Sequence, residues 1–107
     1  MNACNRLIVA GKTGFYFHRA QIYFRNGDYD RAIADLSAFI QLNPNNVRAL
    51  NDRGLSYEKK GEYDKAIADY SEVIRLDKGS ALSYFNRGSA YEKRASWIRR
   101  SRTSEKP

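Results

Sequence analysis

The side chains that could carry out chemistry in this chain are few and far apart in the sequence. His18 is the only histidine and Cys4 the only cysteine, so a site with several histidines and an internal disulfide are both excluded. Cys4 has no fixed base near it, which indicates an inert thiol, and His18 is expected on a helix, partly exposed. Asp64 and Asp69 recur with a regular period, as helix-capping and helix-face residues do, rather than forming an acid–base pair. We therefore expect no enzyme activity, no metal ion and no cofactor.

The triplet Gly11-Lys12-Thr13 matches the end of a phosphate-binding loop. That loop requires another glycine five residues before the second one, and it follows a strand. Arg6 stands at the position of the first glycine. The triplet therefore does not predict a nucleotide site.

The strongest pattern in the chain is a repeat with a period of 34 residues. Residues 27–42 read GDYDRAIADLSAFIQL and residues 61–76 read GEYDKAIADYSEVIRL, so most positions are identical or conservatively changed. Four positions upstream keep the same spacing three times: Arg19/Arg53/Arg87, Ala20/Gly54/Gly88, Tyr23/Tyr57/Tyr91 and Arg25/Lys59/Lys93. The chain therefore contains two complete repeats and the first half of a third.

Apolar residues within each repeat return at helical spacing, which predicts two amphipathic helices per repeat. Gly27 and Gly61 are expected to end the first helix of each repeat in a left-handed conformation. Acids that follow them are expected at the start of the next helix. The candidates for this role are Asp28 or Asp30 and Glu62 or Asp64. We predict helices over about residues 14–26, 29–42, 47–60, 63–76 and 80–97.

Small residues recur in the middle of the first helix of each repeat, at Ala20, Gly54 and Gly88. A glycine inside a helix costs about 1 kcal/mol relative to alanine. Its recurrence therefore indicates a packing requirement, namely that two helix backbones approach closely at these positions.

This arrangement resembles the tetratricopeptide repeat (TPR) family, whose period is about 34 residues. The matching residues are Tyr16, Ala20, Tyr23, Ala32, Leu36 and Pro44 in the first repeat, Leu50, Gly54, Tyr57, Ala66 and Tyr70 in the second, and Tyr84, Gly88 and Tyr91 in the third. Lys78 stands where the second repeat would have its proline. The resemblance implies an all-α superhelix, a TPR solenoid of two complete helix-turn-helix repeats plus the first helix of a third. Its first helices would line a concave face.

The domain boundaries follow from where the repeat begins and stops. The pattern is lost after Arg94, where Ala95 replaces the expected glycine. We expect an N-terminal flank at 1–12, a repeat domain at 13–98 (13–46, 47–80, and 81–98 as a partial repeat or capping helix), and a basic disordered tail at 99–107.

The net charge of +7 lies outside the complete repeats. Residues 13–46 and 47–80 are each neutral, and the excess lies in 1–12, 81–98 and 99–107. A basic flank can hold phosphate weakly through counterion release, which makes a weak binder of nucleic acid or an anionic surface an alternative function. A solvated tail that only aids solubility is the competing interpretation, and nucleic acid is not expected as a partner.

The resemblance implies a protein-interaction scaffold without catalytic activity, which binds a peptide or protein segment along the concave face. The residues that would line this face are Phe17, His18, Gln21, Phe24 and Arg25 from the first repeat, Asn51, Asp52, Leu55, Glu58 and Lys59 from the second, and Leu82, Phe85, Asn86, Ser89 and Lys93 from the third. Each of these residues could instead be a solvated or packed part of its helix.

The identity of the partner does not follow from the resemblance. One TPR subclass clamps the C-terminal carboxylate of chaperones with basic and amide side chains. This chain has Phe17, Gln21, Asp52, Leu82 and Asn86 at those positions, so that ligand is not expected. A truncated array that self-associates, or a homo-dimer formed through the open C-terminal helix, is a further hypothesis. The chain has no apolar run long enough to span a membrane, and cytoplasmic location is the default expectation.

Overall fold

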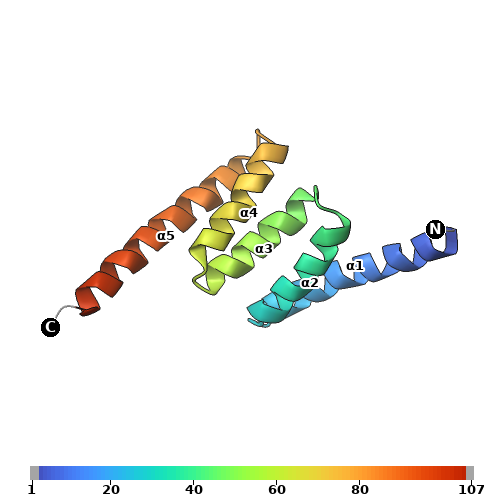
Figure 1. Cartoon of the computed structure of the whole chain (residues 1–107), viewed down its shortest axis with the longest axis horizontal. Helices are drawn as coiled ribbons and strands as arrows, with labels where there is room; N and C mark the ends of the chain where they lie inside the picture. The colour runs from blue at the N-terminus through green and yellow to red at the C-terminus, as the bar shows by residue number, and fades with distance from the viewer. Residues whose placement is uncertain (1–2, 106–107) are drawn as a thin grey trace.

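The protein is described by a computed structural model that covers the backbone of residues 3–105 and the side chains of residues 14–101. The described chain is built from α-helices joined by short turns, so the predicted all-α fold is confirmed. The helices are α1 (Ala3–Arg25), α2 (Tyr29–Leu42), α3 (Val47–Lys59), α4 (Tyr63–Leu76) and α5 (Ala81–Glu105). Consecutive helices pack against one another in a zigzag, and α1 and α5 extend past their neighbours at opposite ends (Figure 1). The molecule is accordingly elongated, with extents of 63 × 30 × 22 Å.

The two outer helices are longer than the sequence predicted. α1 begins at Ala3 instead of residue 14, and α5 continues to Glu105 instead of ending near residue 97. The disordered tail expected from residue 99 is therefore wrong for residues 99–105; residues 106 and 107 lie outside the described part. The physical reason is that residues 95–105 contain neither glycine nor proline, so nothing interrupts the helix.

Glycines end the first helix of both complete repeats, as predicted. Gly27 and Gly61 have φ angles of 81° and 83°, in the left-handed region that side chains with a Cβ atom disfavour. After Gly27, the backbone N–H of Asp28 donates to the carbonyl of Tyr23 at 2.9 Å, which closes the end of α1. Ala95 occupies the equivalent position in α5, and the helix runs through it.

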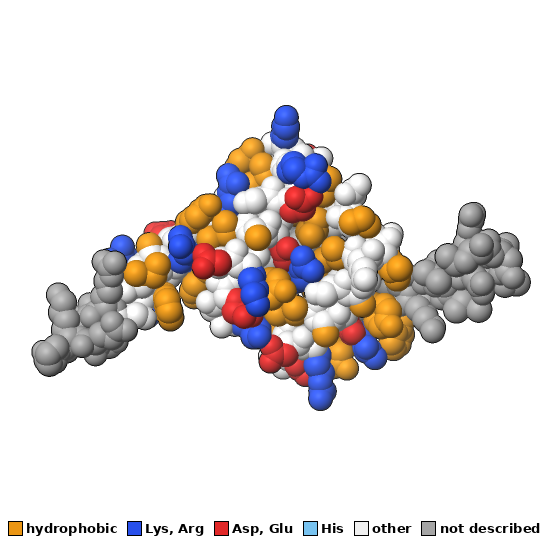
Figure 2. Space-filling model, viewed as in Figure 1, with side chains coloured by type: hydrophobic (Ala, Val, Ile, Leu, Met, Phe, Trp, Pro, Cys, Tyr) orange, Lys and Arg blue, Asp and Glu red, His pale blue; other side chains and the backbone are white. Residues whose placement is uncertain are grey.

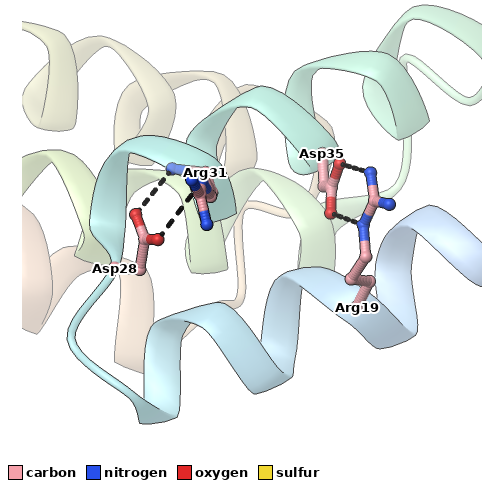
Figure 3. Close-up of polar contacts among 4 residues, drawn as sticks. All are labelled: Arg19, Asp28, Arg31 and Asp35. Carbon is pink, nitrogen blue, oxygen red and sulfur yellow. Dashed lines mark hydrogen bonds and ion pairs between the residues drawn. The ribbon is translucent and has the colours of Figure 1, made fainter.

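The acids after these glycines differ in how they begin the next helix. Asp28 is the N-cap of α2, and its carboxylate accepts the backbone N–H of Arg31 at 3.3 Å (Figure 3). Glu62 occupies the N-cap position of α4, but its side chain makes no capping hydrogen bond. Asn46 caps α3 by accepting from the N–H of Ala49 at 3.0 Å.

Apolar faces of neighbouring helices form the core. One cluster joins the first repeat to the second, and a smaller one joins α4 to α5 through Tyr70. The first consists of Ala20, Leu36, Ile40, Ala49, Leu50 and Val73, and the second of Ala66, Tyr70 and Ala90. Each cluster spans two or more helices, so each repeat depends on its neighbour for burial.

A ladder of arginines crosses the helices at the repeat period. In the first repeat Arg19 donates through Nε and Nη2 to the two carboxylate oxygens of Asp35, both at 2.7 Å (Figure 3). In the second repeat Arg53 makes the same bidentate contact with Asp69, with hydrogen bonds of 2.8 and 2.7 Å. Arg53 also donates to Ser37 Oγ at 3.2 Å, which links it to the preceding repeat. Two-pronged arginine–carboxylate pairs fix the angle between helices as well as their separation.

Candidate functional site

A hollow of about 360 Å³ opens between the first helices of the two complete repeats. α1 and α3 form its walls and α2 supplies part of its floor. The residues that line it are Ala20, Gln21, Phe24, Arg25, Leu36, Arg48, Asp52, Leu55 and Ser56. We refer to this hollow as the α1–α3 groove.

The floor of the groove is apolar and firmly held. Ala20 and Leu36 are buried members of the core cluster, so the floor is fixed by the packing of the repeat. The half-buried side chains of Phe24 and Leu55 also line the groove. The ring of Phe24 meets the ring of Tyr29 edge-on at a centroid distance of 5.3 Å, which orients it. The groove therefore presents a preformed apolar surface.

The rim of the groove is polar and carries both signs of charge. Asp52 is half-buried, and its partial burial raises the pKa of the carboxyl group above its ordinary value, while the positive charge of Arg48 acts in the opposite direction. Arg25 and Arg48 are exposed. A carboxylate beside apolar surface is a hydrogen-bond acceptor that a ligand N–H or cation can satisfy.

Five residues predicted for the concave face lie together in this groove. They are Gln21, Phe24, Arg25, Asp52 and Leu55. Arg48 and Ser56 also line the groove and were absent from the predicted set. Arg48 lies one helical turn before Asp52, and that spacing in the sequence was the available sign that it shares the same face.

Other predicted residues of the first two repeats lie elsewhere. The ring of Phe17 packs against Phe39 at 5.0 Å, at the junction with α2. His18 and Lys59 are exposed and do not line the groove. Asn51 accepts a hydrogen bond from Ser83 Oγ at 3.0 Å, and so links α3 to α5.

The predicted residues of the third repeat do not extend the groove. Phe85 is 73% exposed and Leu82 is also exposed, whereas Asn86 is buried. Ser89 is half-buried outside the groove. The groove is therefore confined to the first two repeats.

Two further predicted residues, Glu58 and Lys93, serve to connect helices. Lys93 Nζ lies 2.6 Å from Glu58 Oε2, and the hydroxyl of Tyr70 donates to Glu58 Oε1 at 3.0 Å. These bonds join α5, α3 and α4. The hydrogen bond to Glu58 raises the pKa of Lys93, and burial together with the charge of Glu58 raises the pKa of Tyr70.

A second hollow, of about 350 Å³, opens between the start of α4 and α5. Positive, negative and apolar side chains are mixed over the face seen in Figure 2. Among the described residues, no group of three His, Cys, Asp or Glu side chains is arranged to hold a metal ion. No helix in that part of the chain is long and apolar enough to cross a membrane.

The fold and sequence match known repeat proteins. A profile of the tetratricopeptide repeat family matches residues 17–81 and 52–96. No curated protein matches this chain in sequence. Among solved structures, the first TPR of Spaghetti (RPAP3), bound to the HSP90 peptide SRMEEVD, is similar with a TM-score of 0.73 and 23% identity. That likeness covers 78% of this chain and 66% of that structure.

The TPR2B domain of yeast Sti1, in a complex with pHsp70, is also similar, with a TM-score of 0.69 and 23% identity over 74% of this chain and 63% of that one. The chain thus spans just under two thirds of the length of both structures. At 23% identity, the likeness of these structures establishes a common fold and no more. Together with the profile, which covers more than half of the chain, it leads to one conclusion: this protein belongs to the tetratricopeptide repeat family.

Proposed function

We propose that this chain is a non-catalytic scaffold that binds a peptide segment of a partner protein in the α1–α3 groove. The observation that carries the proposal is the geometry of the groove, which combines a fixed apolar floor with a polar rim. Peptide sites in helical proteins need both, because apolar contacts supply affinity and polar groups orient the peptide backbone. One of the two similar structures is bound to an HSP90 peptide and the other is a complex with pHsp70, which supports a protein segment as the kind of ligand.

The side chains at the rim of the groove disfavour an acidic C-terminal tail as the ligand. Asp52 places a carboxylate at the rim of the groove, and a ligand carboxylate beside it would be repelled. None of the residues at the positions of a carboxylate clamp is basic; they are Phe17, Gln21, Asp52, Leu82 and Asn86. We propose a peptide that inserts an apolar side chain between Phe24 and Leu55 and offers an N–H donor or a cationic group to Asp52.

The test begins with peptides selected against the full chain from a random displayed library, since the natural partner is not identified. Fluorescence anisotropy then compares the binding of a selected peptide by the wild type, Leu55→Arg and Gln41→Arg. Gln41 is exposed on α2 outside the groove and serves as the matched control. Leu55→Arg should weaken binding by at least about tenfold, as expected when an anchoring contact is lost, and Gln41→Arg should not.

Two results would refute the proposal. One is that the selected peptides bind Leu55→Arg as tightly as the wild type. The other is that they bind only at low salt and through the basic flanks, which would favour the weak anionic-surface binder that the charge distribution also predicts.

A further inference from the structure

Among the described residues, no helix covers the face of α5 that corresponds to the covered faces of α1 and α3. We call it the outer face of α5; Arg87, at its edge, still reaches α4. Arg19 and Arg53 each pair with an aspartate of the following helix, Asp35 and Asp69. Arg87 is the third arginine of the ladder and donates to Ser71 Oγ at 3.3 Å. Among the described residues it has no acidic partner.

The exposed fractions of equivalent residues also show that α5 is less covered than α3. Leu50 of α3 is 3% exposed beneath α4, whereas the equivalent Tyr84 of α5 is 46% exposed. A Cβ atom at Gly54 would meet the ring of Tyr70, whereas one at Gly88 would meet nothing within 4 Å. Tyr91, one turn further along α5, is 48% exposed. The outer face of α5 thus carries two half-exposed tyrosines beside an open glycine.

Two copies of this face are complementary to each other when they run antiparallel. The face is formed by Tyr84, Arg87, Gly88, Tyr91, Glu92 and Ala95, which follow one another at helical spacing. If a second α5 runs antiparallel to the first, with the two-fold axis between residues 89 and 90, Arg87 lies opposite Glu92 of the partner subunit. Gly88 then lies opposite Tyr91 of the partner subunit, and Tyr84 opposite Ala95 of the partner subunit. Each base faces an acid and each tyrosine faces a small residue.

We infer that α5 pairs in this antiparallel register with α5 of a second copy of the chain, forming a symmetric dimer. The two faces match in charge and in side-chain size, and the two-fold symmetry makes each matching pair occur twice. The chain already contains the same tyrosine-on-glycine packing between Tyr70 and Gly54. Glu92 is exposed and has no ion pair among the described residues, so it is available to Arg87 of the partner subunit. A second copy is the occupant that supplies the acid, the base and the matching small residues together.

The outer face of α5 and the α1–α3 groove lie on different helices, so the dimer does not depend on the proposed peptide binding. The interface is one helix wide, and we expect it to associate in about the micromolar range.

Sedimentation equilibrium of the full chain, from about 1 μM to about 1 mM, tests the inference. The wild type should convert from monomer to dimer over this range. Gly88→Leu and Glu92→Arg should each raise the dissociation constant at least about tenfold. The double variant Arg87→Glu/Glu92→Arg, which exchanges the charges, should return to within about threefold of the wild type.

The variants also separate loss of the dimer from loss of the fold. Gly88 has open space around its Cβ position in the single chain, so Gly88→Leu should keep the helical circular dichroism of the wild type. A chain that stays monomeric throughout the range overturns the inference. So does a dimer that both single substitutions leave unchanged, or a double variant that remains as weak as Glu92→Arg alone.

Discussion

The ring of Tyr70 lies so close to the backbone of Gly54 that a Cβ atom at position 54 would be 2.6 Å from Tyr70 Cε1. Tyr70 is fully buried, and its hydroxyl is held by Glu58, so the ring is confined. The contact joins the two helices of the second repeat, and it explains why a helix interior contains a glycine at this position.

Gly54→Ala should therefore destabilise the protein, although alanine is the better helix former. Overpacking costs about 1–3 kcal/mol, and only about 1 kcal/mol of it is offset by helix propensity. Gly88→Ala is the matched control, because it has open space and should stabilise the protein by up to about 1 kcal/mol. Urea unfolding at low protein concentration measures both changes. A Gly54→Ala protein as stable as Gly88→Ala would contradict the packing argument.

The Arg53–Asp69 pair should contribute more to stability than an exposed pair of the same chemistry. The side chain of Asp69 is 8% exposed and that of Asp64, which pairs with Arg94, is 81% exposed. Asp69→Ala leaves Arg53 without its carboxylate inside the repeat and should cost about 3 kcal/mol, whereas Asp64→Ala should cost less than about 1 kcal/mol. Thermal unfolding of the two variants gives the comparison, and equal costs would show that the ladder is not a structural link.

Asp52 should reduce stability at neutral pH. Because burial raises its pKa in the folded state, the charged form is disfavoured by folding, and protonation relieves this penalty as the pH falls through the folded-state pKa. Asp52→Asn should thus raise the melting temperature at neutral pH, and the advantage should shrink under acidic conditions. Melting curves from pH 3 to pH 8 test this, together with a carboxyl NMR titration. An NMR titration midpoint of Asp52 at or below the ordinary aspartate pKa would contradict this prediction.

Lys93 should hold α5 against the second repeat. Its ion pair with Glu58 joins helices that share few other contacts. Lys93→Ala should cost up to about 1 kcal/mol and speed amide hydrogen exchange in α5 more than in α2. Lys78, exposed in the turn before α5, provides the control as Lys78→Ala. Uniform exchange changes along the chain would argue against a local connection.

The helices that form the candidate site could be predicted from the sequence, but the exact set of residues that line it could not. The period placed five predicted residues on the first helices of their repeats, and the structure brings all five into one groove: Gln21, Phe24, Arg25, Asp52 and Leu55. The same reasoning also selected Phe17 and Asn51, which contact neighbouring helices instead. A helical spacing defines a face, but residues at the edge of that face can turn either to the groove or to a neighbour, depending on how the next helix is rotated.

The amino-acid sequence alone was sufficient to predict the number of helices, the turns at Gly27 and Gly61, and the register of one repeat on the next. These features depend on local backbone preference and on periodic burial, which nearby residues control. The packing of the helices was needed to learn that Arg53 reaches Asp69 and that Glu58 joins three helices. The same packing leaves Gly88, unlike Gly54, facing open space. Such contacts depend on the angles between helices and on which helix is present as a neighbour, and a repeating sequence does not distinguish a covered face from an open one.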